Sequence, residues 1–270
     1  MLIYNKTTFQ EGYNAITELD GVHSQMHMDF GILKLSRGAV FHSKEAKERA
    51  FLLMDGSIAF KYANKKNIAM RNSLLDELPH VLQVPKGAEV TLVAHEDSEL
   101  CVQKAINNTD FEAVYYAPEH IRQQRFGEGT MQDSSTRIVR TVFDAKNATF
   151  SEMVLGEVIN FPGKWSSYPP HKHPQPEIYH YRFPDAPSQG FGFGQVGENV
   201  YAIAHESTMI IDPWLVHPQV AAPGYPMYYI WMIAHTEGEK FGPNSRQFVD
   251  EHAWLLDPKV KIWKDTRSKE

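Results

Sequence analysis

The chain has little of several features that define other classes of protein. Cys101 is the only cysteine among 270 residues, so no disulfide can form within the chain and no CxxC metal or redox site exists. Lys and Arg number 27 against 33 Asp and Glu, a net charge of −6, and no basic region is concentrated enough to attract a polyanion. We therefore expect a cytoplasmic protein that does not bind nucleic acid.

Long hydrophobic runs are also missing. The longest, at 227–234, is far below the roughly 20 residues that a membrane helix needs, and the first residues lack the basic and apolar segments of a signal peptide. We expect no membrane association. The 42% of hydrophobic residues is typical of a globular protein, and the length suits one large domain or two ordinary ones.

Helical periodicity is nearly absent, whereas short segments rich in β-branched and aromatic residues recur between Gly, Pro or Asp turns. These segments predict strands at 31–35, 50–53, 57–62, 89–94, 100–104, 137–143, 153–161, 178–183, 199–204, 208–211 and 226–233. Helix is predicted only at 118–125 and within the last 30 residues. The fold class is therefore all-β, a sandwich or barrel, and the polar segment 127–135 separates two predicted domains, 1–127 and 128–270.

The two predicted domains share a pattern of polar residues. A shift of 129 residues aligns three positions of the first domain with three of the second: His42 with His171, Lys44 with His173, and Glu48 with Glu177. A shift of 128 aligns Pro85 with Pro213. Where the second domain has His217, the first has Ala88 at the shift of 129 or Glu89 at the shift of 128. We interpret the pattern as an internal duplication whose first copy has lost metal ligands.

The strongest motif is PPHKHPQPE at 169–177, followed 40 residues later by His217. Alternate side chains of a strand share a face, so His171 and His173 point the same way, and Glu177 can return to that face after a short bend. An HxH alone is more often two surface histidines, but the added Glu and distant His favour a metal. Three imidazoles and one carboxylate suit one divalent ion, Zn foremost, with Mn, Fe, Co or Ni as alternatives, and leave positions open for a substrate.

Residues 192–197 match GxGxxG, the fingerprint of dinucleotide-binding proteins. That motif has meaning only between a strand and a helix, and here it precedes the predicted strand at 199–204. We interpret it as a glycine-rich turn between strands.

The pattern HxHxxxE followed by Pro and a later His resembles the cupin superfamily, and the duplication resembles a bicupin with one degenerate half. Longer segments are similar to the 5-deoxy-glucuronate isomerase family of inositol catabolism (IolB type), namely LQVPKGAEVTLVA at 82–94, GKWSSYPPHKH at 163–173, GFGF at 190–193, HPQVAAPGY at 217–225 and the tyrosines at 228–229. The resemblance implies two β-sandwich or jelly-roll domains, a metal in the second, and an enzyme that isomerises 5-deoxy-glucuronate, an aldose, to 5-dehydro-2-deoxy-gluconate, a ketose.

The chain departs from the family pattern in a shorter segment before Glu177 and in the residues at 215 and 230–235. The substrate is therefore a sugar acid, either the family's own or a related uronate. Strand alternation turns Tyr179 to the side of Glu177, which makes Tyr179 the candidate proton carrier. Arg182 and Lys172 are candidates to bind the substrate carboxylate, although alternation aims both at the other face and a structural salt bridge is an equal alternative for each.

Two other functions fit the same ligands. A sugar-acid-binding cupin would bind without turnover, and an iron-dependent cupin dioxygenase would consume oxygen. Because cupins often pair through exposed strands, a homo-oligomer is also possible.

Overall fold

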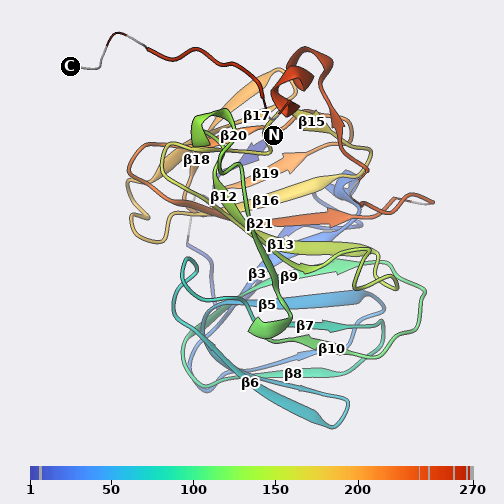
Figure 1. Ribbon diagram of the computed structural model, residues 1–270. Coiled ribbons are helices and arrows are strands. Elements are labelled where there is room, and N and C mark those ends of the chain that lie inside the picture. The colour runs from blue at the N-terminus through green and yellow to red at the C-terminus, as the bar shows by residue number, and fades with distance from the viewer. Residues whose placement is uncertain (6–7, 237, 243, 258, 266, 268–270) are drawn as a thin grey trace.

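The computed structural model describes residues 1–270 except 6–7, 237, 243, 258, 266 and 268–270, and it is built almost entirely of strands (Figure 1). In the C-terminal half the large sheet has the order β1 (Leu2–Ile3), β19 (Thr208–Ile211), β16 (Glu177–Arg182), β21 (Met227–Ala234), β13 (Met153–Asn160), β12 (Arg137–Phe143) and β11 (Arg122–Phe126). A smaller sheet has the order β14 (Trp165–Ser166), β20 (Gln219–Ala221), β17 (Phe191–Val196) and β18 (Asn199–Ala204). A two-stranded ribbon pairs β15 (His171–Lys172) with β22 (Gln247–Phe248).

The N-terminal half repeats the sandwich plan. Its inner strands follow the order β10 (Val114–Tyr116), β7 (Val81–Val84), β5 (Glu48–Tyr62), β9 (Ser98–Ala105), β3 (Asp29–Leu35) and β2 (Gly12–Thr17). The end of β5 pairs with β6 (Lys65–Arg71) and β8 (Val90–Ala94), and β8 pairs with β4 (Val40–Ser43). Gly56, with φ +95°, lies beside a register shift in β5, where a side chain would collide with the backbone of Asp97. One long strand thus belongs to both layers of this half.

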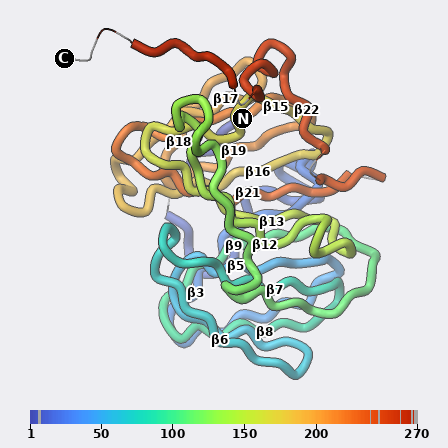
Figure 2. The backbone as a smooth tube through the Cα atoms, in the orientation of Figure 1, coloured from blue at the N-terminus to red at the C-terminus, as the bar shows by residue number. Residues whose placement is uncertain are grey.

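Three hydrophobic cores follow from the alternation of side chains. Leu53 and its neighbours fill the N-terminal sandwich, and Tyr181 and its neighbours fill the C-terminal one. Between them, the large sheets of the two halves pack face to face through residues such as Leu52 and Ile230. The molecule is therefore a stack of sheets, with the two halves one above the other in Figures 1 and 2.

A buried ion cluster ties the halves together. The carboxylate of Glu157, in β13, accepts hydrogen bonds from the two terminal guanidinium nitrogens of Arg71, in β6, at 2.6 and 3.0 Å. It accepts a third from Arg140 at 3.3 Å. The hydroxyl of Tyr228 donates to the same carboxylate at 2.5 Å. The side chains of Arg71 and Glu157 are completely buried, so this cluster joins the two halves without contact with water.

The first and last strands of the N-terminal half, β1 and β11, belong to the large sheet of the C-terminal half. β1 pairs with β19 of the C-terminal sheet, and β11 pairs with β12. The N-terminus accordingly lies within the C-terminal half (Figure 1). The division at 127 and 128 stays a prediction.

The all-β class is confirmed, and predicted strands such as 137–143, 199–204 and 208–211 match the structure. The helix predicted at 118–125 is wrong, because a 3-10 turn at Pro118–His120 is followed by β11, which pairs along its whole length with β12. The other 3-10 segments are Ser24–Met26, Met131–Asp133 and Asp250–Leu256. The GxGxxG segment is largely strand β17 rather than a turn, and only Gly197 belongs to the turn before β18.

Among the helical segments that the structure describes, we find none with the length and hydrophobicity required to cross a membrane.

Candidate metal centre

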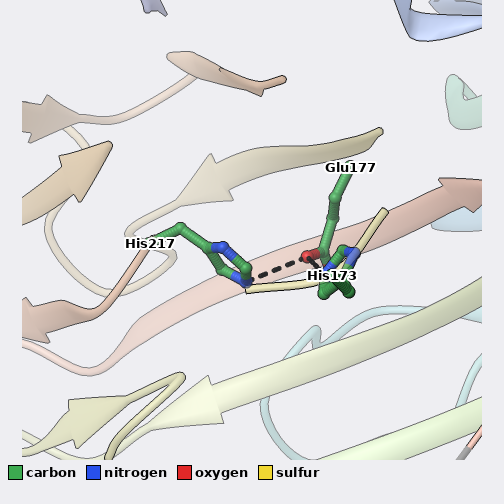
Figure 3. A group of neighbouring side chains, drawn as sticks. All are labelled: His173, Glu177 and His217. Atoms are coloured by element: carbon green, nitrogen blue, oxygen red, sulfur yellow. Dashed lines mark hydrogen bonds and ion pairs between the residues drawn. The ribbon is translucent and has the colours of Figure 1, made fainter. Parts of the chain in front are cut away.

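Three predicted ligands converge inside the C-terminal sandwich. His173 follows β15, Glu177 begins β16, and His217 lies in the loop between β19 and β20 (Figure 3). One possible ligand atom from each residue lies within 4.8 Å of the other two, and all three residues are buried. The backbone N–H of Trp214 donates to the carbonyl of His173 at 2.8 Å. That bond fixes the loop that carries His217 against the strand end that carries His173.

Backbone carbonyls orient the imidazoles. Nδ1 of His173 lies 3.0 Å from the carbonyl oxygen of Gln175, and Nδ1 of His217 lies 2.8 Å from that of Leu215. An Nδ1–H that donates to a carbonyl leaves the Nε2 of a neutral imidazole as an acceptor. The bonds therefore select the tautomer that a metal ligand requires.

The converging atoms fit a cation. Nε2 of His173 and Nε2 of His217 lie 3.1 and 3.2 Å from the same oxygen, Oε2 of Glu177. The contact of His217 has the distance of a hydrogen bond but not its geometry, so among the described residues this buried Nε2 has no hydrogen-bond partner. Burial raises the pKa of Glu177, but close contacts and charge from His173 and His217, each with a proton on Nε2, hold it well below its usual range, so the carboxylate is charged. In the tautomer with Nε2 as acceptor, a bound cation would take the place of those protons. Two imidazole nitrogens and a carboxylate oxygen form a donor set that suits a divalent metal.

His171, the fourth predicted ligand, lies beside this group. Its Nδ1 is 3.1 Å from the carbonyl oxygen of Pro169, and its ring centroid is 5.0 Å from that of His217. Burial and the neighbouring His217 lower the pKa of His171 well below its usual value, so its imidazole is neutral. Its part in metal binding stays a prediction.

A cavity of about 410 Å³ opens from the cluster and is lined by His171, His173 and Glu177. One wall is the inner face of the large C-terminal sheet, which contributes Tyr179, Tyr229 and Trp231 among others, and the facing wall includes part of 241–248. The ribbon of β15 and β22 pairs His171 with Phe248. It therefore attaches the segment that contains Phe241, Arg246 and Phe248, which we call the covering segment, next to the predicted ligands. The cavity is a site where a small molecule can reach a bound metal.

Of the three predicted catalytic residues, only Tyr179 lines this cavity. Its hydroxyl lies 3.0 Å from the hydroxyl of Ser167, and burial followed by the charge of Glu177 raises its pKa well above the usual value. Arg182 points to the other face of β16 and pairs with Glu99 of the N-terminal half and with Glu206.

A substrate-binding role does not fit Arg182, because both carboxylates already hold its guanidinium group in an ion pair. Lys172, in the β15–β22 ribbon, is not among the residues that line the cavity. Strand alternation predicted that Arg182 and Lys172 point away from the predicted ligands, and the positions of both side chains agree with this prediction.

The N-terminal half shows how its metal-type residues were replaced. Lys44 and Glu89 form an exposed ion pair of 2.7 Å, and Nδ1 of His42 lies 3.0 Å from the hydroxyl of Thr91. The alignment of Glu48 with Glu177 is wrong by one residue. The side chain of Glu48 lies on the same face of its strand as Leu52, which packs in the core between the two halves. Glu177 instead lies on the same face as Tyr181, which packs inside the C-terminal sandwich.

Arg49 is the residue of β5 that shares the sandwich-facing side with Leu53. Its buried guanidinium group donates to the hydroxyl of Ser43 and to the carbonyls of Pro85 and Ala88. A positive charge thus stands where the C-terminal half has a carboxylate ligand.

Three arginines line the cavity, Arg122, Arg137 and Arg246, and none of them was predicted from the sequence. Arg137 begins strand β12, and its inward direction could have been predicted from the alternation that it shares with Val139. Arg246 lies in a segment without a strand-like or helical pattern, so its approach to the cavity had no signal in the sequence.

Two β-sandwich halves, one of which holds clustered histidines and a glutamate beside a cavity, define a protein of the cupin class, a bicupin with a degenerate N-terminal half. Residues 2–255 match the model of the KduI/IolB family. The chain belongs to this family, as the sequence resemblance predicted.

Individual relatives agree with this assignment. A 5-deoxy-glucuronate isomerase of Geobacillus thermodenitrificans is 26% identical over 255 residues, which cover 87% of this chain and 88% of the relative. The crystal structure of an IolB-like protein from Salmonella typhimurium has a TM-score of 0.81 at 20% identity and covers 94% of this chain and 98% of its own.

An oxalate decarboxylase of Lactobacillus farciminis shares the fold at a TM-score of 0.63 and 10% identity, with 88% of this chain and 86% of that one covered. The prediction of an enzyme related to the 5-deoxy-glucuronate isomerases is confirmed by the family match and the curated relatives.

Proposed function

We propose that the protein is a metal-dependent isomerase that converts 5-deoxy-glucuronate, or a closely related uronate, into its 2-ketose isomer, as a step of inositol catabolism. One divalent ion per chain, zinc as first choice, would be held by His171, His173, Glu177 and His217. The observation that supports this proposal is the convergence of the Nε2 atoms of His173 and His217 on Glu177 at the edge of a cavity large enough for a sugar acid. The substrate is inferred from the named relatives.

An aldose-to-ketose conversion moves a proton from the hydroxyl-bearing carbon to the carbonyl carbon and exchanges the roles of two oxygens. A divalent ion held by these residues would supply Lewis acidity, which would make the C–H bond next to the carbonyl easier to break. The hydroxyl pair of Tyr179 and Ser167 lies in the cavity wall at 3.0 Å from each other. We assign Tyr179 as the proton carrier. Its neutral hydroxyl gives a proton to the aldehyde oxygen and takes one from the hydroxyl-bearing carbon; it then gives a proton to the former aldehyde carbon and takes one from the second oxygen, so that the protons balance.

Aromatic side chains cover the ligands on the cavity side. The ring centroid of Phe241 lies 5.1 Å from that of His173, and Phe248 lies 5.7 Å from His171. These rings limit the water around the reacting carbons, which strengthens the electrostatic interactions of the site.

The direct test combines metal analysis with turnover. Protein purified without chelator is analysed for metal, and 5-deoxy-glucuronate is incubated with it while NMR follows the aldehyde and ketone signals. We expect one metal per chain, interconversion without oxidant or nucleotide, and loss of both in His173→Ala. The matched control is His42→Ala, at the aligned position of the degenerate half, which should keep activity within a few-fold of the parent.

Each contrary result has a distinct meaning. Full metal occupancy in His173→Ala would refute the ligand set, and two metals per chain would refute the assignment of the first half as degenerate. Oxygen uptake would favour a dioxygenase, and binding of the sugar acid without turnover would favour a binding protein. We also propose a cytoplasmic location, supported by the single, buried Cys101, while a homo-oligomer stays a prediction.

A further inference from the structure

Two arginines that the proposed chemistry does not use face the cavity. Arg137 lies on its sheet wall, at the start of β12, and Arg246 lies in the covering segment just before β22. Within the described residues neither has a carboxylate at ion-pair distance, whereas Arg122 of the same cavity pairs with Asp144 at 2.6 Å. Arg137 and Arg246 therefore bring two positive charges to the cavity, and neither is in an ion pair with a described residue.

Contacts hold both guanidinium groups in place. Arg137 donates to the carbonyl of Ser135 at 2.8 Å and lies 5.7 Å from the ring centroid of Phe126. Arg246 lies 5.3 Å from the ring centroid of Phe241, the same ring that contacts His173. One aromatic ring thus separates the guanidinium group of Arg246 from a ligand of the proposed metal.

The electrostatics favour an anion between the arginines. Burial lowers the pKa of Arg137, and the positive charge of Arg246 lowers it further, so the two groups repel each other across the cavity. An anion that contacts both would remove this repulsion. The planar fork of a guanidinium group matches the two oxygens of a carboxylate, with two parallel hydrogen bonds.

We propose that Arg137 and Arg246 clamp the carboxylate of an open-chain sugar acid whose carbonyl end faces His173, Glu177 and His217. This inference rests on the proposed function, which supplies the sugar acid, and it assigns the carboxylate to residues other than Arg182 and Lys172. The arginines would then select uronates over neutral aldoses and would set the reacting carbons at the metal end of the cavity. Lys146 also borders the cavity and is exposed, as Arg246 is, but its ammonium group is a point charge without the planar fork that matches a carboxylate.

The test measures binding apart from turnover. The probe is 5-deoxy-glucuronate reduced to the alcohol at its aldehyde carbon, which keeps the carboxylate but cannot isomerise, and its affinity is measured by calorimetry with metal-loaded protein. We expect Arg246→Gln and Arg137→Gln each to weaken binding about 10- to 100-fold, the range for losing hydrogen bonds to a charged group, with unchanged metal content. The KM for the uronate should rise by a similar factor. Arg246→Lys should fall between Arg246→Gln and the parent.

Arg125→Gln is the matched control, because Arg125 belongs to the same strand as the cavity residue Phe126 but is not among the residues that line the cavity. Its affinity should equal that of the parent. Parent-like binding of the reduced acid by both glutamine variants would overturn the inference, as would a parent protein that does not bind it at millimolar concentration. A parent that binds the reduced acid but does not turn over the aldehyde would refute the proposed isomerase, and loss of that binding in Arg246→Gln would still support the clamp.

Discussion

The buried cluster around Glu157 provides a test of how the two halves are held together. Glu157→Gln preserves the shape of the side chain but removes the only negative charge that Arg71 and Arg140 share among the described residues. Two buried guanidinium groups would then face a neutral amide, and the hydroxyl of Tyr228 would lose its charged acceptor. Removal of one partner from a buried ion pair typically costs about 3–5 kcal/mol, because the remaining charge stays without compensation.

The assay is equilibrium unfolding in urea, monitored by tryptophan fluorescence and by circular dichroism. With a slope of about 3 kcal/mol per molar urea, the expected loss moves the midpoint down by roughly 1–2 M. Tyr228→Phe removes one hydrogen bond to a charged group and should cost about 1.5–3 kcal/mol. Lys44→Gln is the control, since its partner Glu89 is an exposed carboxylate, and it should leave the midpoint nearly unchanged.

A midpoint of Glu157→Gln within 0.3 M of the parent, roughly 1 kcal/mol at that slope, would refute the reasoning. It would mean that water or a rearranged side chain compensates the arginines in the variant. Metal content should stay at the parent level, because Glu157 faces the N-terminal half while the next residue, Val158, faces the cavity.

Three further predictions concern single side chains. Tyr179→Phe should lower kcat at least 10-fold with unchanged metal content, since general acid–base groups contribute about 10²–10⁴-fold, and a parent-like kcat would exclude it as the proton carrier. Burial lowers the pKa of His235 to about 4, below its unfolded value near 6.5. Between these two values the unfolded chain binds a proton that the folded protein does not. The free energy of unfolding is therefore highest above pH 6.5 and falls by about 3 kcal/mol as the pH drops toward 4. His235→Asn can still accept from the N–H of Phe241, and it should reduce the change of the urea midpoint between pH 7 and pH 4. An equally large change in the variant and the parent would contradict this assignment. Gly156→Ala should destabilise the fold by about 1–3 kcal/mol, because the new Cβ would lie 2.4 Å from Nε1 of Trp231 and 2.5 Å from the backbone oxygen of Arg140. A parent-like melting temperature would show that both the indole and the neighbouring strand can shift.

The fold class and the placement of the predicted ligands His173 and Glu177 beside each other could be predicted from the sequence, because both depend on local alternation. His173 and Glu177 lie within one short segment, and a proline turn marked the approach of His217. The helix predicted at 118–125 failed because a short polar segment gives no local sign that it will pair with β12. The same limit applies to Arg246, whose place beside Phe241 depends on tertiary contacts alone.

The duplication illustrates a different limit. Alignment by residue identity matched Glu48 with Glu177, but a one-residue shift in a strand moves a side chain to the opposite face. The physical equivalent of Glu177 is Arg49, which identity could not reveal. At this position the N-terminal half has a cation that binds backbone carbonyls, where the C-terminal half has an anion.

The pairing of β1 with β19 has a consequence for the order in which the protein folds during synthesis. The amino group of Met1 donates to the carbonyl of Ile210 across 209 residues of sequence. A ribosome that has released the whole N-terminal half has therefore not yet made the partner of its first strand. Until residue 211 emerges, the backbone groups of β1 stay unpaired and available to other chains. The edge of the sheet that carries Glu177 is completed only at that late moment, by a segment that was made about 200 residues earlier.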